Sequence, residues 1–157
     1  MPLQRKAHIH DTKPTGPDAI LFAEFATKKS GKEPMPEPRR LVLCVDDEAV
    51  GLLVRKMILE RAGYKVLTAQ DGATGLEVFA EEPIEAVVLD YAMPGMDGGQ
   101  VAACMRARKP QVPILLLSAY LALPSDVTRH VDVYMTKGEG APMFLEKLNG
   151  LFSTVST

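Results

Sequence analysis

The stretch VVLDYAMPGMDG, residues 87–98, joins an apolar run, an acid and a break in the chain. Three apolar residues lead directly into Asp90, and a Pro-Gly pair follows at 94–95. An apolar run bounded by turn residues is typical of a buried strand. A carboxylate at a buried strand end is costly to desolvate unless another group pairs with it. The stretch therefore predicts a strand of a covered sheet whose terminal acid needs a partner.

The same alternation of apolar runs and helical patterns extends over most of the chain. The predicted strands are 41–45, 65–69, 86–90, 113–119 and 131–136. The predicted helices are 48–62, 72–82, 98–108 and a final one with Phe144, Leu145, Leu148, Leu151 and Phe152 on one face. Strand–helix alternation of this kind indicates an α/β fold in which helices cover both faces of a parallel sheet.

The predicted helix at 48–62 has an apolar stripe and a polar one. The apolar residues at helical spacing are Val50, Leu53, Val54, Met57 and Ile58, and the polar residues opposite them are Arg55, Lys56 and Glu60. An amphipathic helix turns its apolar stripe toward the core. We therefore expect the first group on the core side and the second group on the far side.

Charge and proline separate the first 40 residues from the rest. They hold six of the twelve prolines, and eight Lys or Arg residues against five Asp or Glu residues. The proline spacing of SGKEPMPEPRR, residues 30–40, is typical of a semi-rigid linker. We predict a flexible N-terminal extension at 1–40 and one domain at 41–153. A short helix at 18–29, either docked on the domain or a partner or mobile, is an additional expectation.

The overall composition excludes several classes of protein. The chain has 157 residues, a net charge of −2 and 46% hydrophobic residues, which gives no sign of nucleic-acid binding through bulk charge. No apolar run is long enough for a membrane span or a signal peptide. Cys44 and Cys104 lie in apolar segments without metal-type spacing, so we expect buried thiols in a cytoplasmic protein.

Acidic residues follow two predicted strands at the edge where open α/β sheets bind ligands. Asp46 and Asp47 follow the strand at 41–45, and Asp90 ends the strand at 86–90. In the strand order 2-1-3-4-5 these strands are neighbours, so the three carboxylates would converge. Because clustered carboxylates repel one another, we expect a divalent cation, and all-oxygen ligands favour Mg²⁺.

Two further strand ends complete a candidate site for phosphoryl chemistry. Ser118 ends the fourth predicted strand, and Lys137 follows the fifth. The lysine and a metal ion would neutralise phosphoryl oxygens, the hydroxyl would donate a hydrogen bond, and one carboxylate would act as the nucleophile. His130 is the only histidine of the predicted domain, so a serine–histidine or cysteine–histidine pair does not compete.

The segment from Leu41 to Phe152 resembles the receiver domain of bacterial two-component response regulators. The matching motifs are VDDE (45–48), LDYAMPGMDG (89–98), SA (118–119) and YMTK (134–137), in the family's order and at nearly its intervals. The resemblance implies a flavodoxin-like, doubly wound, five-stranded parallel sheet of strand order 2-1-3-4-5. It also implies an aspartyl-phosphorylated interaction switch that is not an enzyme, although it promotes its own phosphoryl transfer and dephosphorylation.

The resemblance further assigns partners and residue roles. The implied phosphodonor is a histidine kinase or a histidine phosphotransfer protein, the output is an unknown downstream protein, and no direct DNA binding is expected. Asp90 matches the phosphoacceptor, Asp47 a direct Mg²⁺ ligand and Asp46 the acid that acts through a bound water. Asp90 itself and the backbone carbonyl of Ala92 match further metal ligands. Ser118 matches the switch hydroxyl, Lys137 the phosphoryl-binding charge and Tyr134 the aromatic switch. Ala92 and Tyr120 match the side chains that control water access.

The chain also departs from the family pattern. Gly138 replaces the proline that usually follows the lysine, so the usual cis peptide cannot be assumed. The residues between Ser118 and Lys137 are a few fewer than usual and include Pro124, so the fourth helix is predicted to be short, distorted or absent. Only five residues follow Phe152, and we therefore expect a stand-alone receiver. Asp97 is expected to cap the third helix rather than to bind a ligand.

Two alternative functions remain. The first is a receiver-like scaffold that does not use phosphorylation, which the altered segment 118–138 favours and the intact acids and lysine oppose. The second is an aspartate-nucleophile phosphatase of the haloacid dehalogenase type. That family needs a second acid two positions after its nucleophile, and Glu48 and Ala49 stand two positions after Asp46 and Asp47, a poor match.

Overall fold

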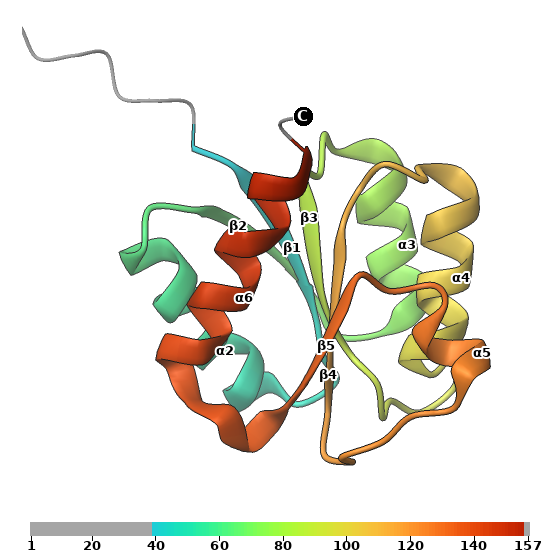
Figure 1. Ribbon diagram of the computed structural model, residues 1–157. Coiled ribbons are helices and arrows are strands. Elements are labelled where there is room, and N and C mark those ends of the chain that lie inside the picture. Colours follow the sequence, from blue (N-terminus) through green and yellow to red (C-terminus); the bar gives the residue numbers. More distant parts are fainter. Residues whose placement is uncertain (1–38, 156–157) are drawn as a thin grey trace, which may run out of the picture. The chain divides into compact units, whose positions relative to one another are not determined.

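The computed structural model describes residues 39–155, which contain a five-stranded, all-parallel sheet with helices on both faces (Figure 1). The strands are β1 (Leu41–Val45), β2 (Lys65–Ala69), β3 (Ala86–Asp90), β4 (Ile114–Ser118) and β5 (Val133–Thr136). Their order is β2-β1-β3-β4-β5, which confirms the prediction. Because β1 and β3 are neighbours at the centre, with Val45 opposite Leu89, the residues that follow these two strands lie close together.

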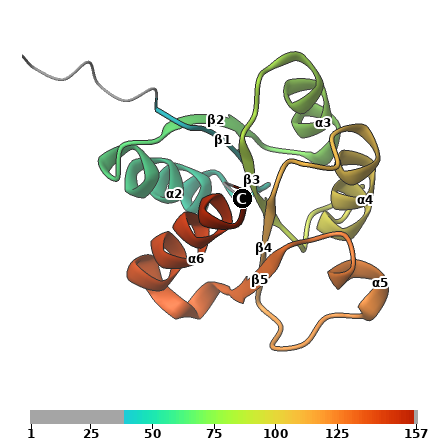
Figure 2. The same ribbon diagram turned by 45° about the horizontal axis from the view of Figure 1, so that its top comes forward.

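Five α-helices cover this sheet within the described part of the chain. They are α2 (Ala49–Arg61), α3 (Gly72–Glu81), α4 (Gly98–Arg108), α5 (Ser125–Thr128) and α6 (Gly140–Val155), and a 3₁₀ turn, η1 (Lys137–Glu139), precedes the last of them. Helices α2 and α6 lie on one face, and α3, α4 and α5 lie on the other, as Figures 1 and 2 show. No helix in residues 39–155 combines the length and the apolar character needed to cross a bilayer.

The side chains of the central strands alternate between two apolar layers, as the two-residue period of a strand requires. Those on the α2 and α6 side include Val42, Cys44, Val88, Leu115 and Leu117. Those on the α3 and α4 side include Leu43, Val45, Val87, Leu89 and Leu116. Strands β3 and β4 are buried along their whole length, which explains why they appear in the sequence as continuous apolar runs.

The structure corrects the predicted orientation of α2. Val50 and Leu53, which we expected in the core, are 72% and 57% exposed, and Val54 and Met57 are exposed as well. The buried residues of the helix are Leu52 and Leu59, seven positions apart, so they lie on one face. Ile58, the fifth residue of the predicted group, does pack against the core. The exposed stripe contains more apolar residues than the buried one, so the apolar pattern alone predicts the wrong face for the other four. The exposed set, Val50, Leu53, Val54 and Met57, is called the α2 stripe below.

The segment between β4 and β5 contains only one helical turn, α5, as the sequence predicts for a shortened fourth helix. Arg106 of α4 holds the rest of the segment in place. Its guanidinium donates to the carbonyl of His130 at 3.0 Å and pairs with Asp132 at 2.6 Å. Asp132 also accepts from the backbone N–H of Ile114 at 2.8 Å, at the start of β4. This network anchors the segment without a full helix.

Several sequence predictions fall outside these residues or are confirmed within them. The extension up to residue 38, with its predicted helix at 18–29, lies outside the described residues.

Asp97 caps α4, since its carboxylate accepts from the N–H of Gln100 at 2.9 Å and the Gln100 side chain accepts from the Asp97 N–H at 3.0 Å. The N–H of Gly98 donates to the carbonyl of Tyr91 at 2.8 Å, which closes the loop after Asp90.

The close approach at Gly98 predicts a sharp difference between two glycine substitutions. A Cβ at Gly98 would lie 2.5 Å from the carbonyl oxygen of Asp90 and 2.7 Å from the Cα of Tyr91, both backbone atoms. Gly98→Ala should therefore lower the free energy of unfolding by about 1–3 kcal/mol. Gly150→Ala is the control, since a Cβ there meets nothing within 4 Å and alanine favours a helix by about 0.5–1 kcal/mol. Denaturant unfolding measures both, and equal effects would contradict this account.

Candidate functional site

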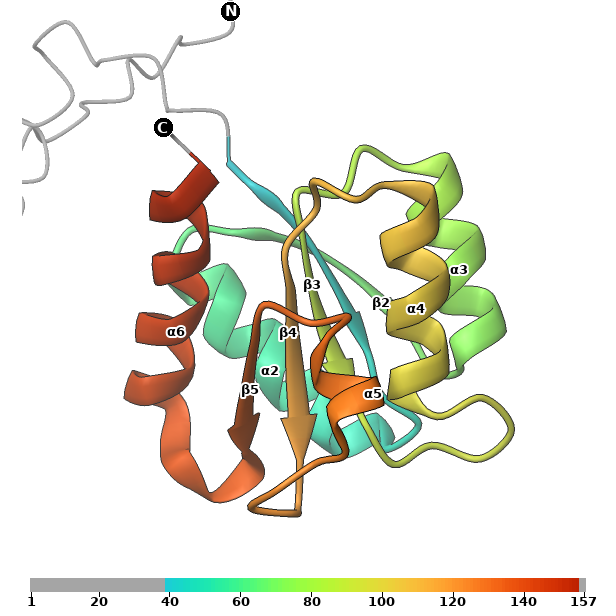
Figure 3. The ribbon, with the colours of Figure 1, turned by 45° about the vertical axis from the view of Figure 1, so that its right-hand side comes forward.

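Three carboxylates converge at the carboxyl edge of the sheet, the edge toward which the strand arrows point in Figure 3. Asp46 and Asp47 follow β1, and Asp90 is the last residue of β3. One oxygen of each lies within 4.8 Å of the others, a spacing that can hold a metal ion. Asp46 and Asp90 are only 1% and 2% exposed, whereas Asp47 is exposed. Because two of the acids are buried, they require nearby positive charge.

Two cations meet the two buried carboxylates. The Lys137 ammonium lies 2.9 Å from Oδ1 of Asp90, and the Arg55 guanidinium forms an ion pair with Oδ2 of Asp46. The other oxygen of Asp46, Oδ1, accepts from the N–H of Glu48 at 2.9 Å. The lysine was predicted from the sequence, but the arginine was assigned to the polar face of its helix, away from the core. That assignment was wrong.

A pattern in the sequence places Arg55 on the buried face of α2. Leu52, Arg55 and Leu59 are separated by three and then four residues, so they share one side of the helix. Burial lowers the pKa of Arg55, while its neighbours Cys44 and Asp90 oppose that decrease. Burial also raises the pKa of Cys44 to about 12, so this thiol stays protonated at neutral pH and offers no thiolate to a metal.

Lys137 is held by a turn rather than by a proline. The N–H of Thr136 donates to the Glu139 carboxylate at 2.8 Å, and Lys147 of α6 donates to the same side chain at 3.1 Å. These hydrogen bonds, first that of Lys147 and then that of Thr136, lower the pKa of Glu139. The peptide bond from Lys137 to Gly138, where glycine replaces proline, is trans. The η1 turn therefore fixes the backbone that carries the lysine.

The remaining predicted residues take different positions around the site. Ser118 is buried at the end of β4, beside the end of β3, and its Oγ accepts from the N–H of Tyr120 at 2.9 Å. The Tyr120 ring is 60% exposed and meets the Tyr91 ring edge-on, with 6.5 Å between ring centroids. Tyr134 is 39% exposed. The side chain of Ala92 is exposed beside the end of β3.

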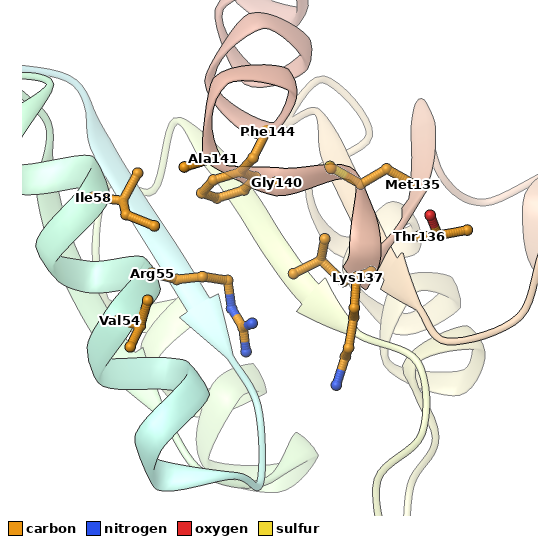
Figure 4. Close-up of a pocket in the computed structure, with 10 residues that line it drawn as sticks. Val54, Arg55, Ile58, Met135, Thr136, Lys137, Gly140, Ala141 and Phe144 are labelled. Carbon is orange, nitrogen blue, oxygen red and sulfur yellow. The ribbon is translucent and has the colours of Figure 1, made fainter.

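A pocket of about 220 Å³ lies beside the acids, between α2 and α6. Its wall is mostly apolar and includes Val54, Ile58, Leu117, Met135 and Phe144. Arg55 and Lys137 line the same pocket, and in Figure 4 their nitrogen ends point toward the end of the strand arrows. The two cations thus approach the acid cluster from opposite sides of one cavity.

The arrangement suits the handling of a phosphoryl group. Three clustered carboxylates provide the all-oxygen ligands that Mg²⁺ prefers, and one of them lies beside an ammonium and a strand-end hydroxyl. A carboxylate next to fixed positive charge can attack phosphorus, because that charge offsets the repulsion between the two anions.

Comparisons with known proteins agree with this architecture. The family model of the response regulator receiver domain matches residues 42–147. The transcriptional regulatory protein RprY of Bacteroides fragilis is 34% identical over 118 residues, which are 73% of this chain and 48% of RprY. The chain therefore spans about half the length of this curated relative.

Two solved structures add detail about related proteins. The response regulator TrrA of Thermotoga maritima, crystallised in complex with Mg²⁺ and BeF, is 34% identical with a TM-score of 0.68, over 71% of this chain and 98% of that one. A chain from the complex of the histidine kinase ThkA with TrrA is 31% identical with a TM-score of 0.67, over 71% and 97% of the two chains.

The acid cluster predicts the effect of removing its exposed member. Asp47→Ala should weaken Mg²⁺ binding by about tenfold or more, because one carboxylate ligand is lost. The free energy of unfolding should not fall, because the change also relieves repulsion between acids. Glu81→Ala, at the end of α3 near the opposite edge of the sheet, removes the same charge without touching the cluster. Titration calorimetry compares the three proteins, and equal Mg²⁺ affinity for Asp47→Ala and native protein would contradict a ligand role.

Proposed function

The chain belongs to the family of response regulator receiver domains, and on that premise we propose that it is a Mg²⁺-dependent phosphoacceptor that works as an interaction switch. The observation that carries the proposal is the environment of Asp90. This carboxylate ends a buried strand, lies 2.9 Å from the Lys137 ammonium and shares a cluster with two further acids. A buried carboxylate beside a fixed positive charge can act as a nucleophile toward phosphorus.

In the proposed reaction, a carboxylate oxygen of Asp90 attacks the phosphorus of a phosphohistidine on a partner protein. The bond from phosphorus to the imidazole nitrogen breaks, and the imidazole leaves. Lys137 would pair with an oxygen of the incoming group, and Ser118 would donate a hydrogen bond to another once its hydroxyl turns from the Tyr120 N–H. The positions of both side chains at adjacent strand ends support these roles.

The residues that would hold the ion are Asp46, Asp47, Asp90 and the backbone carbonyl of Ala92. The fit of the carboxylates rests on their mutual spacing of less than 4.8 Å and on the buried charge of two of them. When bound, Mg²⁺ supplies positive charge that offsets the repulsion between these acids and a phosphoryl group.

The switch would connect the phosphorylated site to the exposed surface of β5. Movement of Ser118 toward a phosphoryl oxygen would empty the space beside β4 that its hydroxyl now fills. Tyr134 lies opposite Leu116, two residues before Ser118, so its side chain projects from the same face of the sheet as Ser118, and it is 39% exposed. A ring that changes from exposed to buried alters the surface that a downstream protein contacts.

A histidine kinase or a histidine phosphotransfer protein is the proposed phosphodonor. The related protein TrrA forms a complex with the histidine kinase ThkA, which makes the same class of partner reasonable here. The donor must bring a phosphohistidine within bonding distance of Asp90, so it must touch surfaces next to the site. The α2 stripe is such a surface, because Val54 lines the same pocket as Lys137. Its exposed apolar side chains suit a protein partner.

A small phosphodonor tests the proposed chemistry without the partner. Incubation with acetyl phosphate and Mg²⁺, followed by intact-mass measurement, should reveal the addition of one phosphoryl group. Omission of Mg²⁺ or the substitution Asp90→Asn should abolish it, whereas Asp97→Asn should not, because that residue caps α4. A native protein that stays unmodified would support the phosphorylation-independent scaffold instead, and full labelling of Asp90→Asn would exclude this acceptor.

The side chains beside the acceptor predict the lifetime of the phosphorylated form. Ala92 carries no polar atom to orient an attacking water, and the Tyr120 ring packs against Tyr91, next to Asp90. Because hydrolysis needs water held in line with the breaking bond, we expect slow self-dephosphorylation. The double variant Ala92→Asn, Tyr120→Glu should lose its phosphoryl group about tenfold faster. Mass measurements after removal of the donor follow both decays, and an equal or faster native decay would disprove this role.

A further inference from the structure

Arg55 is a cation inside the acidic site that the phosphoacceptor chemistry does not require. Its guanidinium pairs with Oδ2 of Asp46, a carboxylate that is 1% exposed, and its own side chain is 15% exposed. It comes from the buried face of α2, between Leu52 and Leu59, where an apolar residue would satisfy the core. A charged group at such a position is costly unless its partner needs it.

Arg55 changes the net charge of the acid cluster. The three clustered carboxylates face two cations, Arg55 and Lys137, so this group carries a net charge of −1. Without Arg55 the net charge would be −2. A divalent cation is attracted less strongly to the cluster with Arg55, at −1, than to the cluster without it, at −2. Because Arg55 and Asp46 are largely buried, solvent screens this difference only in part.

We propose that Arg55 is a built-in counter-cation that competes with Mg²⁺ for the acid cluster and thereby sets the Mg²⁺ concentration at which the site fills. Oδ1 of Asp46 already accepts from the N–H of Glu48 and Oδ2 pairs with Arg55, so an ion that approaches Asp46 through Oδ2 must weaken this pair. The guanidinium can move away from Asp46 into the pocket between α2 and α6, because Arg55 also lines this pocket. This inference rests on the proposed function, since it concerns the same metal site.

The competition predicts opposite effects on the metal-free and the metal-bound protein. Without metal, loss of the guanidinium leaves the buried carboxylate of Asp46 unpaired, so the melting temperature should fall. With saturating Mg²⁺ the ion replaces the lost charge, so most of that difference should disappear. A residue that only stabilised the fold would lower the melting temperature by the same amount in both conditions.

Titration calorimetry with MgCl₂, at constant ionic strength and pH, tests the proposal on the full chain. In Arg55→Met, a neutral side chain of similar length, the dissociation constant for Mg²⁺ should fall about tenfold. Arg55→Lys keeps the charge and should stay near the native affinity. Lys56→Met is the matched control, because it removes a neighbouring charge of α2 whose ion pair within residues 39–155 is with Glu60, at 3.9 Å, and not with the acid cluster. This control should match the native protein within about twofold.

Equal or weaker Mg²⁺ binding by Arg55→Met would overturn the inference and leave the proposed function intact. If Arg55→Met does not fold without metal, Arg55→Gln, which is neutral but still donates a hydrogen bond to Asp46, carries the same expectation of tighter binding. If neither the native protein nor any variant binds Mg²⁺, the proposed metal site itself fails, and the inference fails with it.

Discussion

Two carboxylates buried at the ends of neighbouring parallel strands impose the main constraint on this protein. Asp46 and Asp90 are almost inaccessible to solvent, and Asp47 adds a third negative charge beside them. Such a cluster is stable only when cations reach it, since each buried charge loses its hydration. Lys137 reaches it from the end of β5, and Arg55 reaches it from the inner face of α2. The positions of β5, η1 and α2 relative to the central strands therefore matter for more than core packing.

The sheet tolerates the local departures of this chain because other interactions replace what is lost. The fourth helix is reduced to one turn, but Arg106 and Asp132 connect α4, the α5 segment and the start of β4. Glycine follows Lys137 in place of proline, but the Thr136 and Glu139 capping pair fixes the turn that carries the lysine. In both places, side-chain hydrogen bonds to backbone groups supply the order that a longer helix or a rigid ring would otherwise provide.

The electrostatics of the site would link the proposed metal binding to the stability of the domain. A group of three acids and two cations carries a net charge of only −1 without metal, so the protein's own cations already stabilise the two buried acids. The same balance reduces the attraction for a divalent ion. Each cation that the fold places beside the acids therefore supplies part of the stabilisation that a bound ion would otherwise supply.

The sequence by itself determined the strand pattern and the parallel α/β architecture, and the order of the strands followed from the resemblance to receiver domains. Short continuous apolar runs that end in Asp90 and Ser118 and are followed by turn residues are typical of strands buried on both faces, and the motifs at their ends identified the edge where the candidate site lies. The capping role of Asp97 was also predictable, because its interaction with Gln100 is local in the chain.

Only the tertiary structure decided which face of α2 meets the sheet. Five apolar residues at helical spacing pointed to one face, but of these only Ile58 packs against the core, and the helix turns Leu52, Arg55 and Leu59 inward. The hydrophobic pattern measures how apolar each stripe is, whereas the rotation of a helix depends on what lies beneath it. Beneath this one lies a buried carboxylate 9 positions earlier in the chain, whose need for a cation appears only after β1 and α2 are packed together. The spacing of Leu52, Arg55 and Leu59 fits one helix face, but the apolar pattern favours another face, and the charge pair that decides between the two forms only in the folded domain.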